Sequence, residues 1–189
     1  MTVGVLALQG AFRAHIQILN QLDAETAEVR VPADLEGVDA LVIPGGESTT
    51  ISMLLESSGL FEPLADKIEK GMAVLGTCAG LILLSTNIED GRADQRSFRR
   101  LDIDVQRNGY GTQIESFETE LETTVTPDAV HAVFIRAPRI TRVGSGVEVL
   151  AESRGEPVLV RQGNALGAAF HPELSQDPRI HQLFLDSIA

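Results

Sequence analysis

The sequence has 189 residues, of which 27 are acidic and 15 basic, giving a formal net charge of -12 at pH 7. This length predicts a single domain over residues 1–189, and the 43% hydrophobic and 22% charged residues are typical of a globular chain, not a disordered one. The acidic balance and the lack of any basic run longer than Arg99-Arg100 argue against nucleic acid or an anionic membrane surface as a partner.

Cysteine usage and the first residues predict a cytoplasmic protein. Cys78 is the only cysteine, which excludes an internal disulfide and a thiolate-rich metal site. An apolar run begins at Val3, and no basic segment of a signal peptide precedes it. The longest nearly apolar stretch, Met72 to Leu84, is shorter than the roughly 20 residues that a membrane-spanning helix needs.

The first half of the chain alternates short apolar runs with amphipathic segments, which is typical of a parallel sheet covered by helices. The predicted elements, in chain order, are a strand at Val3–Leu8, a helix from Phe12 to Leu22, a strand at Glu25–Val31, a loop at Pro32–Gly37, a strand at Asp39–Ile43, a helix around Ile51–Leu55, a helix at Phe61–Ile68 and a strand at Ala73–Leu75. We expect Ser48 or Thr49 to cap the second of these helices.

The second half is predicted to consist mostly of strands. Residues from Asn87 to Asp104 mix Asp, Glu and Arg with few apolar residues, which predicts an exposed loop. Strands are predicted at Leu101–Val105, Glu115–Val125, His131–Ile135, Val147–Glu152, Val158–Arg161 and Ala165–Phe170. Asp177 is expected to cap a last helix that has Pro178 in its first turn.

A buried strand runs directly into Gly76-Thr77-Cys78-Ala79-Gly80, and an apolar helix follows. This is the pattern of a nucleophile elbow with sulfur in place of oxygen, because the two glycines leave room for a strained turn. Such a turn places Cys78 at a helix N-terminus, which favours its thiolate, and directs the Ala79 N–H towards an oxyanion. The alternative is a buried cysteine between two incidental glycines.

A thiolate nucleophile needs a base, and the chain has four histidines. We interpret His15, His131 and His181 as surface or helix-packing residues. His171 differs because it follows an apolar run at the end of a predicted strand, and Glu173, two residues later, faces the same side. Glu173 can therefore hold the His171 ring in the tautomer that a Cys-His-Glu triad requires. Taken alone, this His-Pro-Glu segment also fits a capped loop.

A second glycine-containing turn, Pro44–Thr50, lies between a predicted strand and a predicted helix. It lacks the ending of a P-loop and the spacing of a dinucleotide fingerprint, so nucleotide binding is not expected. We interpret Gly46 as a second source of N–H groups for the oxyanion, and Glu47 or Ser48 as polar contacts to substrate. An ordinary turn with a helix cap is the alternative.

Together these segments resemble the PdxT-type glutaminase family of pyridoxal 5′-phosphate synthase, within the class I glutamine amidotransferases. The resemblance is carried by Leu8–Gly10, Pro44–Thr50, Gly76–Leu84, Arg107–Gly111, Phe134–Pro138 and Phe170–Leu174. The cysteine elbow and His-x-Glu indicate only the wider class, whereas Gly-Glu-Ser-Thr-Thr and Phe-Ile-Arg-Ala-Pro make the match specific.

The resemblance implies a flavodoxin-like, three-layer αβα sandwich with a mostly parallel central sheet. It also implies hydrolysis of L-glutamine to L-glutamate and ammonia without a cofactor or metal. The ammonia is expected to pass to a separate synthase (lyase, PdxS-type) subunit in a hetero-oligomer. Two departures from the family pattern, Ala14 where Glu is usual and Thr112 where Arg is common, lie outside the triad and bear on details of docking.

By position, the resemblance makes Cys78 the nucleophile, His171 the general acid and base, and Glu173 its orienting partner. Gly46 and Ala79 are the implied backbone donors of the oxyanion hole. The implied glutamine-binding residues are Gly46, Glu47, Ser48, Arg107, Ile135 and Arg136.

Two other functions remain open. One is a different cysteine hydrolase of the same superfamily, although in several of those a histidine directly follows the nucleophile, where this chain has Ala79. The other is a regulatory binding module without catalysis, and the presence of all three triad residues argues against it.

Overall fold

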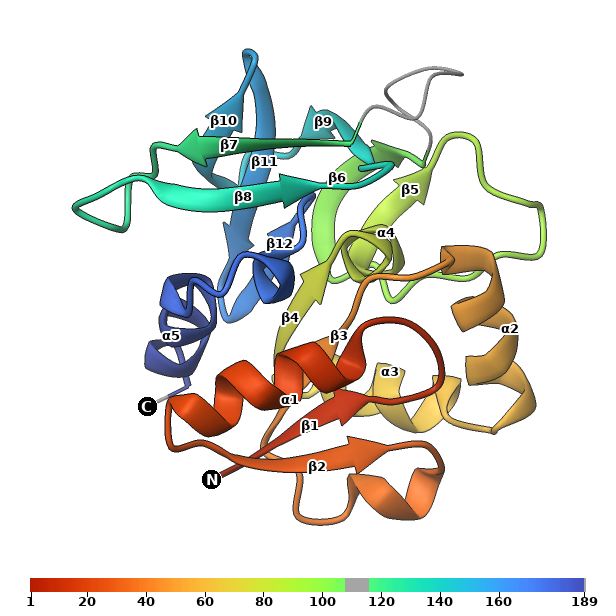
Figure 1. The fold of residues 1–189 in the computed structure, drawn as a ribbon. Helices are drawn as coiled ribbons and strands as arrows, with labels where there is room; N and C mark the ends of the chain where they lie inside the picture. Colours follow the sequence, from red (N-terminus) through yellow and green to blue (C-terminus); the bar gives the residue numbers. More distant parts are fainter. Residues whose placement is uncertain (108–115, 189) are drawn as a thin grey trace.

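A central sheet of seven strands organises the chain (Figure 1), and the computed structural model describes residues 1–107 and 116–188. The strands are β1 (Thr2–Leu6), β2 (Glu25–Val29), β3 (Ala40–Ile43), β4 (Ala73–Thr77), β10 (Glu148–Ser153), β11 (Glu156–Gln162) and β12 (Ala165–Ala168). Their order is β10-β11-β12-β4-β3-β1-β2. The five strands from β12 to β2 are parallel, whereas β11 is antiparallel to both of its neighbours. Strands β3, β4 and β12 are buried throughout, as expected for strands covered on both faces.

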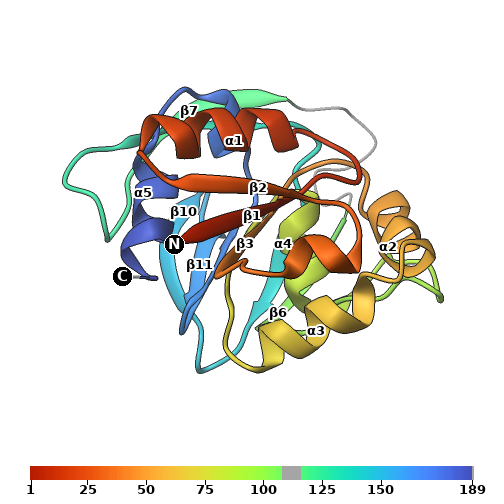
Figure 2. The same cartoon turned by 90° about the horizontal axis from the view of Figure 1, so that it is seen from below.

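Helices cover both faces of this sheet (Figure 2). They are α1 (Phe12–Gln21), α2 (Ser48–Ser57), α3 (Phe61–Glu69), α4 (Ala79–Leu84) and α5 (Arg179–Asp186). Helices α1 and α5 lie on one face, and α2, α3 and α4 lie on the other. The predicted three-layer αβα class with a mostly parallel sheet is therefore confirmed. Within the described part of the chain, no helix has the length and apolar character needed to cross a membrane.

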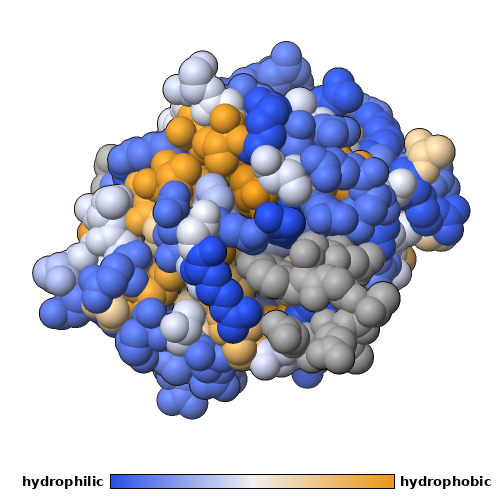
Figure 3. Space-filling model, turned by 90° about the horizontal axis from the view of Figure 1, so that it is seen from above, coloured by the Kyte–Doolittle hydropathy of each residue, from blue (hydrophilic) through white to orange (hydrophobic). Residues whose placement is uncertain are grey.

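Two smaller sheets lie beyond the end of the central sheet towards which β4 points (Figure 1). One contains β5 (Ser85–Ile88), β6 (Leu101–Gln106) and β9 (Arg139–Val143), and the other is the hairpin of β7 (Phe117–Leu121) and β8 (Val130–Phe134). Figure 3 views the molecule from this side, where hydrophilic residues predominate and hydrophobic residues form a band across part of the face.

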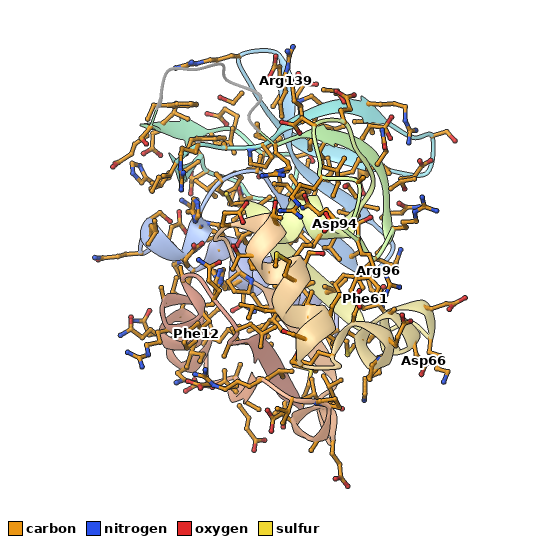
Figure 4. All side chains as sticks on the ribbon, turned by 90° about the vertical axis from the view of Figure 1, so that its right-hand side faces the viewer. Phe12, Phe61, Asp66, Asp94, Arg96 and Arg139 are labelled. Atoms are coloured by element: carbon orange, nitrogen blue, oxygen red, sulfur yellow. The ribbon has the colours of Figure 1, made fainter. Side chains whose placement is uncertain are left out.

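The expected loop from Asn87 to Asp104 is wrong at its first two residues, which belong to β5, a strand that pairs in parallel with β6. At its other end, the strand predicted at Leu101–Val105 is confirmed by β6. The chain between these strands is largely exposed, as predicted, but side chains tie it to two helices. The Arg96 guanidinium lies 3.7 Å from the centre of the Phe61 ring and donates to Glu56 at 2.7 Å and Glu62 at 2.8 Å (Figure 4). Arg96 thus links this segment to both α2 and α3.

Two further predictions fail where local hydrogen bonds select another conformation. The expected loop at Pro32–Gly37 contains a 3-10 turn over Pro32–Leu35, stabilised by Asp34, whose carboxylate accepts from two preceding backbone N–H groups at 2.9 and 3.0 Å. The strand expected over Glu115–Val125 ends at Leu121, because the Thr123 hydroxyl accepts from the Thr126 N–H at 2.9 Å and forms a turn. Its expected first residue, Glu115, lies outside the described residues.

The predicted cap of α2 is also wrong. Glu47, not Ser48 or Thr49, occupies the N-cap, and its carboxylate accepts from the Thr49 N–H at 3.2 Å and the Thr50 N–H at 2.7 Å. A carboxylate with two oxygens can satisfy two of the unpaired N–H groups of the first turn, whereas a hydroxyl satisfies one.

At α5 the predicted start is displaced by one residue. Pro178 stands at the N-cap and the helix begins at Arg179, whose N–H donates to the Asp177 carboxylate at 3.1 Å. Asp177 therefore accepts a hydrogen bond from the first N–H of the helix, but it does so from the residue before the N-cap and not from the N-cap itself.

Candidate active site

Cys78 lies on a tight turn between β4 and α4. Its backbone has φ 49° and ψ -103°, an uncommon conformation for a residue with a side chain. A Cβ at Gly80 would overlap the Ile43 carbonyl oxygen, and one at Gly76 would lie 2.6 Å from the Gly80 carbonyl carbon. The two glycines of the predicted elbow are thus required because backbone segments approach closely on both sides.

His171 reaches Cys78 because the strands that precede them are neighbours. Strands β12 and β4 pair in parallel with Ala168 opposite Thr77, and the Cys78 N–H donates to the Ala168 carbonyl at 2.8 Å. The Cys78 and His171 side chains are close enough to interact, and this interaction raises the pKa of His171. A Cβ on Gly45, in the loop after β3, would lie 3.0 Å from His171 Nδ1 and 3.2 Å from Cys78 Cβ, so bare backbone closes this side of the pair.

Glu173 holds the other side of the His171 ring. Its Oε1 lies 2.7 Å from His171 Nδ1, and the carboxylate is fully buried. Burial alone lowers the pKa of His171, but hydrogen bonds to Cys78 and Glu173 outweigh it and raise that pKa well above its ordinary value. Burial alone raises the pKa of Glu173, and the bond from His171 together with the nearby His15 ring lowers it overall. The geometry therefore favours an imidazolium beside a carboxylate.

Two histidines interpreted as surface or helix-packing residues form a buried layer behind Glu173. His15 Nε2 lies 3.4 Å from Glu173 Oε2 and 3.1 Å from Thr77 Oγ1, and His15 Nδ1 lies 2.8 Å from His181 Nε2. Both histidines are 0% exposed, so a surface position is wrong for each. His15 is also more than a packing residue, because it contacts Glu173 directly.

The sequence carried a signal for this position of His15. It lies four residues before Leu19 and seven before Leu22, so it falls on the apolar stripe of its helix. The remaining histidine, His131, is partly exposed on β8 and pairs with Glu118 and Glu120 at 2.9 Å each.

A pocket of about 240 Å³ opens beside the Cys78–His171 pair. It is lined by Gln9, Gly46, Glu47, Ser48, Cys78, Ile82, Arg107, Ile135, Arg136 and His171. Every residue predicted to bind glutamine lies in this lining, together with Cys78 and His171. Glu173 and Ala79 are buried beside it. The volume is below the roughly 300–1,000 Å³ of pockets for drug-sized ligands, and so suits a smaller molecule.

The pocket brings a cation and an anion together. Arg107 donates to Glu47 Oε1 at 3.2 Å and, with its other terminal nitrogen, to Gln95 Oε1 at 3.1 Å. Burial raises the pKa of Glu47, but hydrogen bonds from Thr50 and then Thr49, with the charge of Arg107, lower it overall, so the carboxylate stays charged. These charges suit the carboxylate and ammonium of a free amino acid.

Two glutamines that contact pocket residues, Gln95 and Gln9, were not predicted from the sequence to belong to the site. Gln95 bridges Arg107 and Ser48, to whose hydroxyl its amide donates at 3.0 Å. Gln9 accepts the Glu47 N–H at 3.0 Å and so orients the backbone next to Gly46. Gln9 belonged to a quoted motif, whereas Gln95 lies in a segment whose composition indicated only a loop.

Two residues depart from the pattern of the family that the sequence resembles, Ala14 and Thr112. Ala14 is half-buried in α1, and Thr112 lies outside the described residues. Among residues 1–107 and 116–188, no group of three or more His, Cys, Asp or Glu side chains is arranged to hold a metal ion.

Comparison with known proteins identifies the family. Residues 5–189 match the SNO glutamine amidotransferase family. The chain is 52% identical to the pyridoxal 5′-phosphate synthase subunit PdxT of Mycobacteroides abscessus, over 98% of this chain and 96% of that protein. It is 50% identical to the PdxT subunit of Corynebacterium jeikeium, over 98% and 95%. A crystal structure of a glutamine amidotransferase superposes with a TM-score of 0.92 at 48% identity, covering 98% of both chains. The chain belongs to the SNO glutamine amidotransferase family.

Proposed function

We propose that this chain is the glutaminase subunit of a pyridoxal 5′-phosphate synthase: it hydrolyses L-glutamine to L-glutamate and ammonia, which the synthase subunit consumes. The observation that carries the proposal is the Cys78–His171–Glu173 constellation beside a pocket that also holds Arg107 and Glu47. The near full-length similarity to PdxT subunits supports both the substrate and the partner.

In the first half of the reaction, the Cys78 thiolate attacks the carbon of the glutamine side-chain amide. The Ala79 and Gly46 N–H groups stabilise the oxyanion that forms. As the C–N bond breaks, His171 donates its proton to the departing nitrogen, which leaves as ammonia. A thioester between Cys78 and the glutamyl group remains.

In the second half, neutral His171 accepts a proton from water, and the hydroxide adds to the thioester. The C–S bond breaks, glutamate leaves, and the thiolate and imidazolium are restored. Glu173 stabilises the imidazolium and fixes its ring throughout, through the 2.7 Å bond to Nδ1. Arg107 binds the α-carboxylate of glutamine, and Glu47 its ammonium group.

The proposal includes a hetero-oligomer with the synthase subunit, a cytoplasmic location, and no role for nucleic acid. The partner is supported by the names of the relatives, the location by the single cysteine, and the absence of nucleic acid by the net charge of -12. We also propose that the isolated subunit is poorly active until the synthase subunit completes the oxyanion hole.

The test is ammonia release from glutamine by the parent protein and by Cys78→Ala, each with and without the synthase subunit. We expect release by the parent protein, much faster with the partner, and none by the variant, which should retain its melting temperature and partner binding. An electrophilic glutamine analogue should label Cys78 alone. Undiminished release by Cys78→Ala would remove the central step of the proposal.

A further inference from the structure

Behind His171, three buried side chains form a continuous series of polar contacts. Only one of the three, Glu173, has a role in the mechanism above. The series runs from His181 on α5 through His15 on α1 to Glu173. The separations are 2.8 Å from His181 Nε2 to His15 Nδ1 and 3.4 Å from His15 Nε2 to Glu173 Oε2. We propose that His15, in the tautomer with hydrogen on Nε2, is a positioning residue that holds the Glu173 carboxylate for His171.

The hydrogen-bond partners of the series select this tautomer. With hydrogen on Nε2 of both rings, His181 donates to His15 Nδ1, and His15 donates to Thr77 Oγ1 at 3.1 Å, which places its N–H dipole 3.4 Å from Glu173 Oε2. The opposite arrangement turns the lone pair of His15 Nε2 towards a carboxylate. It also leaves a buried N–H at His181 Nδ1, which has no hydrogen-bond partner. An unpaired buried donor is rarer in proteins than an unpaired acceptor.

Burial keeps both of these rings neutral. Burial lowers the pKa of His15 and outweighs the charge of Glu173, which raises it. The charge of His171 lowers the pKa of His15 further. Burial also lowers the pKa of His181 to about 3, and the neighbouring His15 adds to this. A neutral His15 contributes a directed donor without adding a second positive charge next to the His171 imidazolium.

The consequence for catalysis passes through Glu173. Its Oε1 is bonded to His171, whereas its buried Oε2 has no hydrogen-bond partner among the described residues and lies 3.4 Å from His15 Nε2. If His15 is removed, Oε2 loses the N–H dipole that lies next to it, so the anionic carboxylate is less stable, and so is the imidazolium that it stabilises. The expected result is fewer thiolate–imidazolium pairs at neutral pH, with the substrate pocket itself unchanged.

The inference rests on the proposed function, but its main test needs neither glutamine nor the synthase subunit. The rate of Cys78 alkylation by iodoacetamide is measured against pH for the parent chain, His15→Leu and His15→Gln. Because the buried Glu173 carboxylate loses the polar group nearest to its Oε2, we expect His15→Leu to move the acid limb of the profile up by about one pH unit. His15→Gln keeps an N–H donor near the position of Nε2 and should restore most of the parent profile.

Two controls separate positioning from a merely structural role. His131→Leu removes the partly exposed histidine that pairs with two carboxylates, Glu118 and Glu120, and should leave the profile unchanged. In a Glu173→Gln background, His15→Leu should cause little further shift, since its effect passes through that carboxylate. A full-sized effect in that background, or a His15→Leu profile that superposes on the parent, would overturn the inference.

A measurement on the unmodified chain covers the case in which His15→Leu does not fold. Nitrogen-15 NMR of the histidine rings at pH 7 should find His15 and His181 neutral, with hydrogen on Nε2. Hydrogen on Nδ1 of His15 would overturn the inference.

Glutamine hydrolysis is assayed separately with the synthase subunit, where His15→Leu should lower kcat and leave KM unchanged. Absence of hydrolysis by the parent complex would overturn the proposed function, not the tautomer assignment.

Discussion

Replacing Gly76 by alanine tests whether the elbow needs bare backbone on the strand side. The added Cβ would lie 2.6 Å from the carbonyl carbon and oxygen of Gly80 and 2.7 Å from Leu84 Cδ1. Ordinary contact begins at 3.4 Å, so β4 and α4 must separate by the difference, roughly 0.8 Å. Because Cys78 lies on the turn that joins these elements, the separation displaces the nucleophile as well as the core.

Both effects have an expected size. Overpacking of this kind costs about 1–3 kcal/mol, which for a chain of this length lowers the melting temperature by roughly 2–12 °C. A displacement near 1 Å at a reacting group can cost about 100-fold in rate, so kcat should fall by a factor approaching that. The assays are thermal unfolding and ammonia release in complex with the synthase subunit.

Gly146→Ala is the matched control. The nearest atom to its added Cβ is Gln162 Nε2 at 3.7 Å, so at this exposed position the substitution makes only an ordinary van der Waals contact. The control should match or slightly exceed the parent in stability, because alanine reduces the freedom of the unfolded chain. If Gly76→Ala also retains the parent melting temperature and rate, the steric account of the elbow is wrong.

Three further predictions concern charge. Glu173→Gln should lower kcat/KM by about 10- to 100-fold, because the bond to His171 loses its charge; an unchanged rate would exclude an orienting role. Arg107→Lys should raise KM more than it lowers kcat, because a lysine cannot donate in two directions from one plane; steady-state kinetics measure this, and a pure kcat effect would contradict it. Finally, the free energy of unfolding, measured with urea, should fall as the pH drops from 6.5 to 5. Burial lowers the pKa of His15 and of His181 in the folded chain. Over this pH range the unfolded chain therefore binds more protons than the folded chain, which favours unfolding. The slope should approach about 1.4 kcal/mol per pH unit for each histidine, and a flat profile would contradict it.

The sequence predicted the parallel sheet and the elbow because their signals are local. Buried parallel strands give continuous apolar runs, as at Ala73–Leu75, and a strained turn needs glycines at fixed positions around Cys78. The placement of His171 followed from the strand before it. The pairing of β12 with β4, which brings the two side chains together, involves residues more than 80 positions apart, and no local pattern encodes it.

Other features were missed because their signals are weak or depend on distant contacts. Strand β9 was not predicted, since Ile140 is its only buried residue and the alternation of apolar and polar residues is weak. The cap at Glu47 was missed because short side chains such as Ser and Thr are the usual N-caps. Here a longer glutamate folds back to accept from the N–H groups of the helix that follows it. The contact of His15 with Glu173 joins a helix near the start of the chain to a turn near its end, so only the folded structure could show it.

The pairing of β4 with β12 also limits how the chain can change in length. Cys78 follows β4 directly and His171 lies three residues beyond β12, so each is anchored by the ladder between these strands. Deleting one residue from β12 draws the imidazole back by about 3.3 Å and turns alternate side chains to the opposite layer. Added residues in the hairpin turn between β7 and β8 change the position of neither Cys78 nor His171. We therefore expect natural length variation between Cys78 and His171 to be concentrated in such turns, while β12 keeps its four residues.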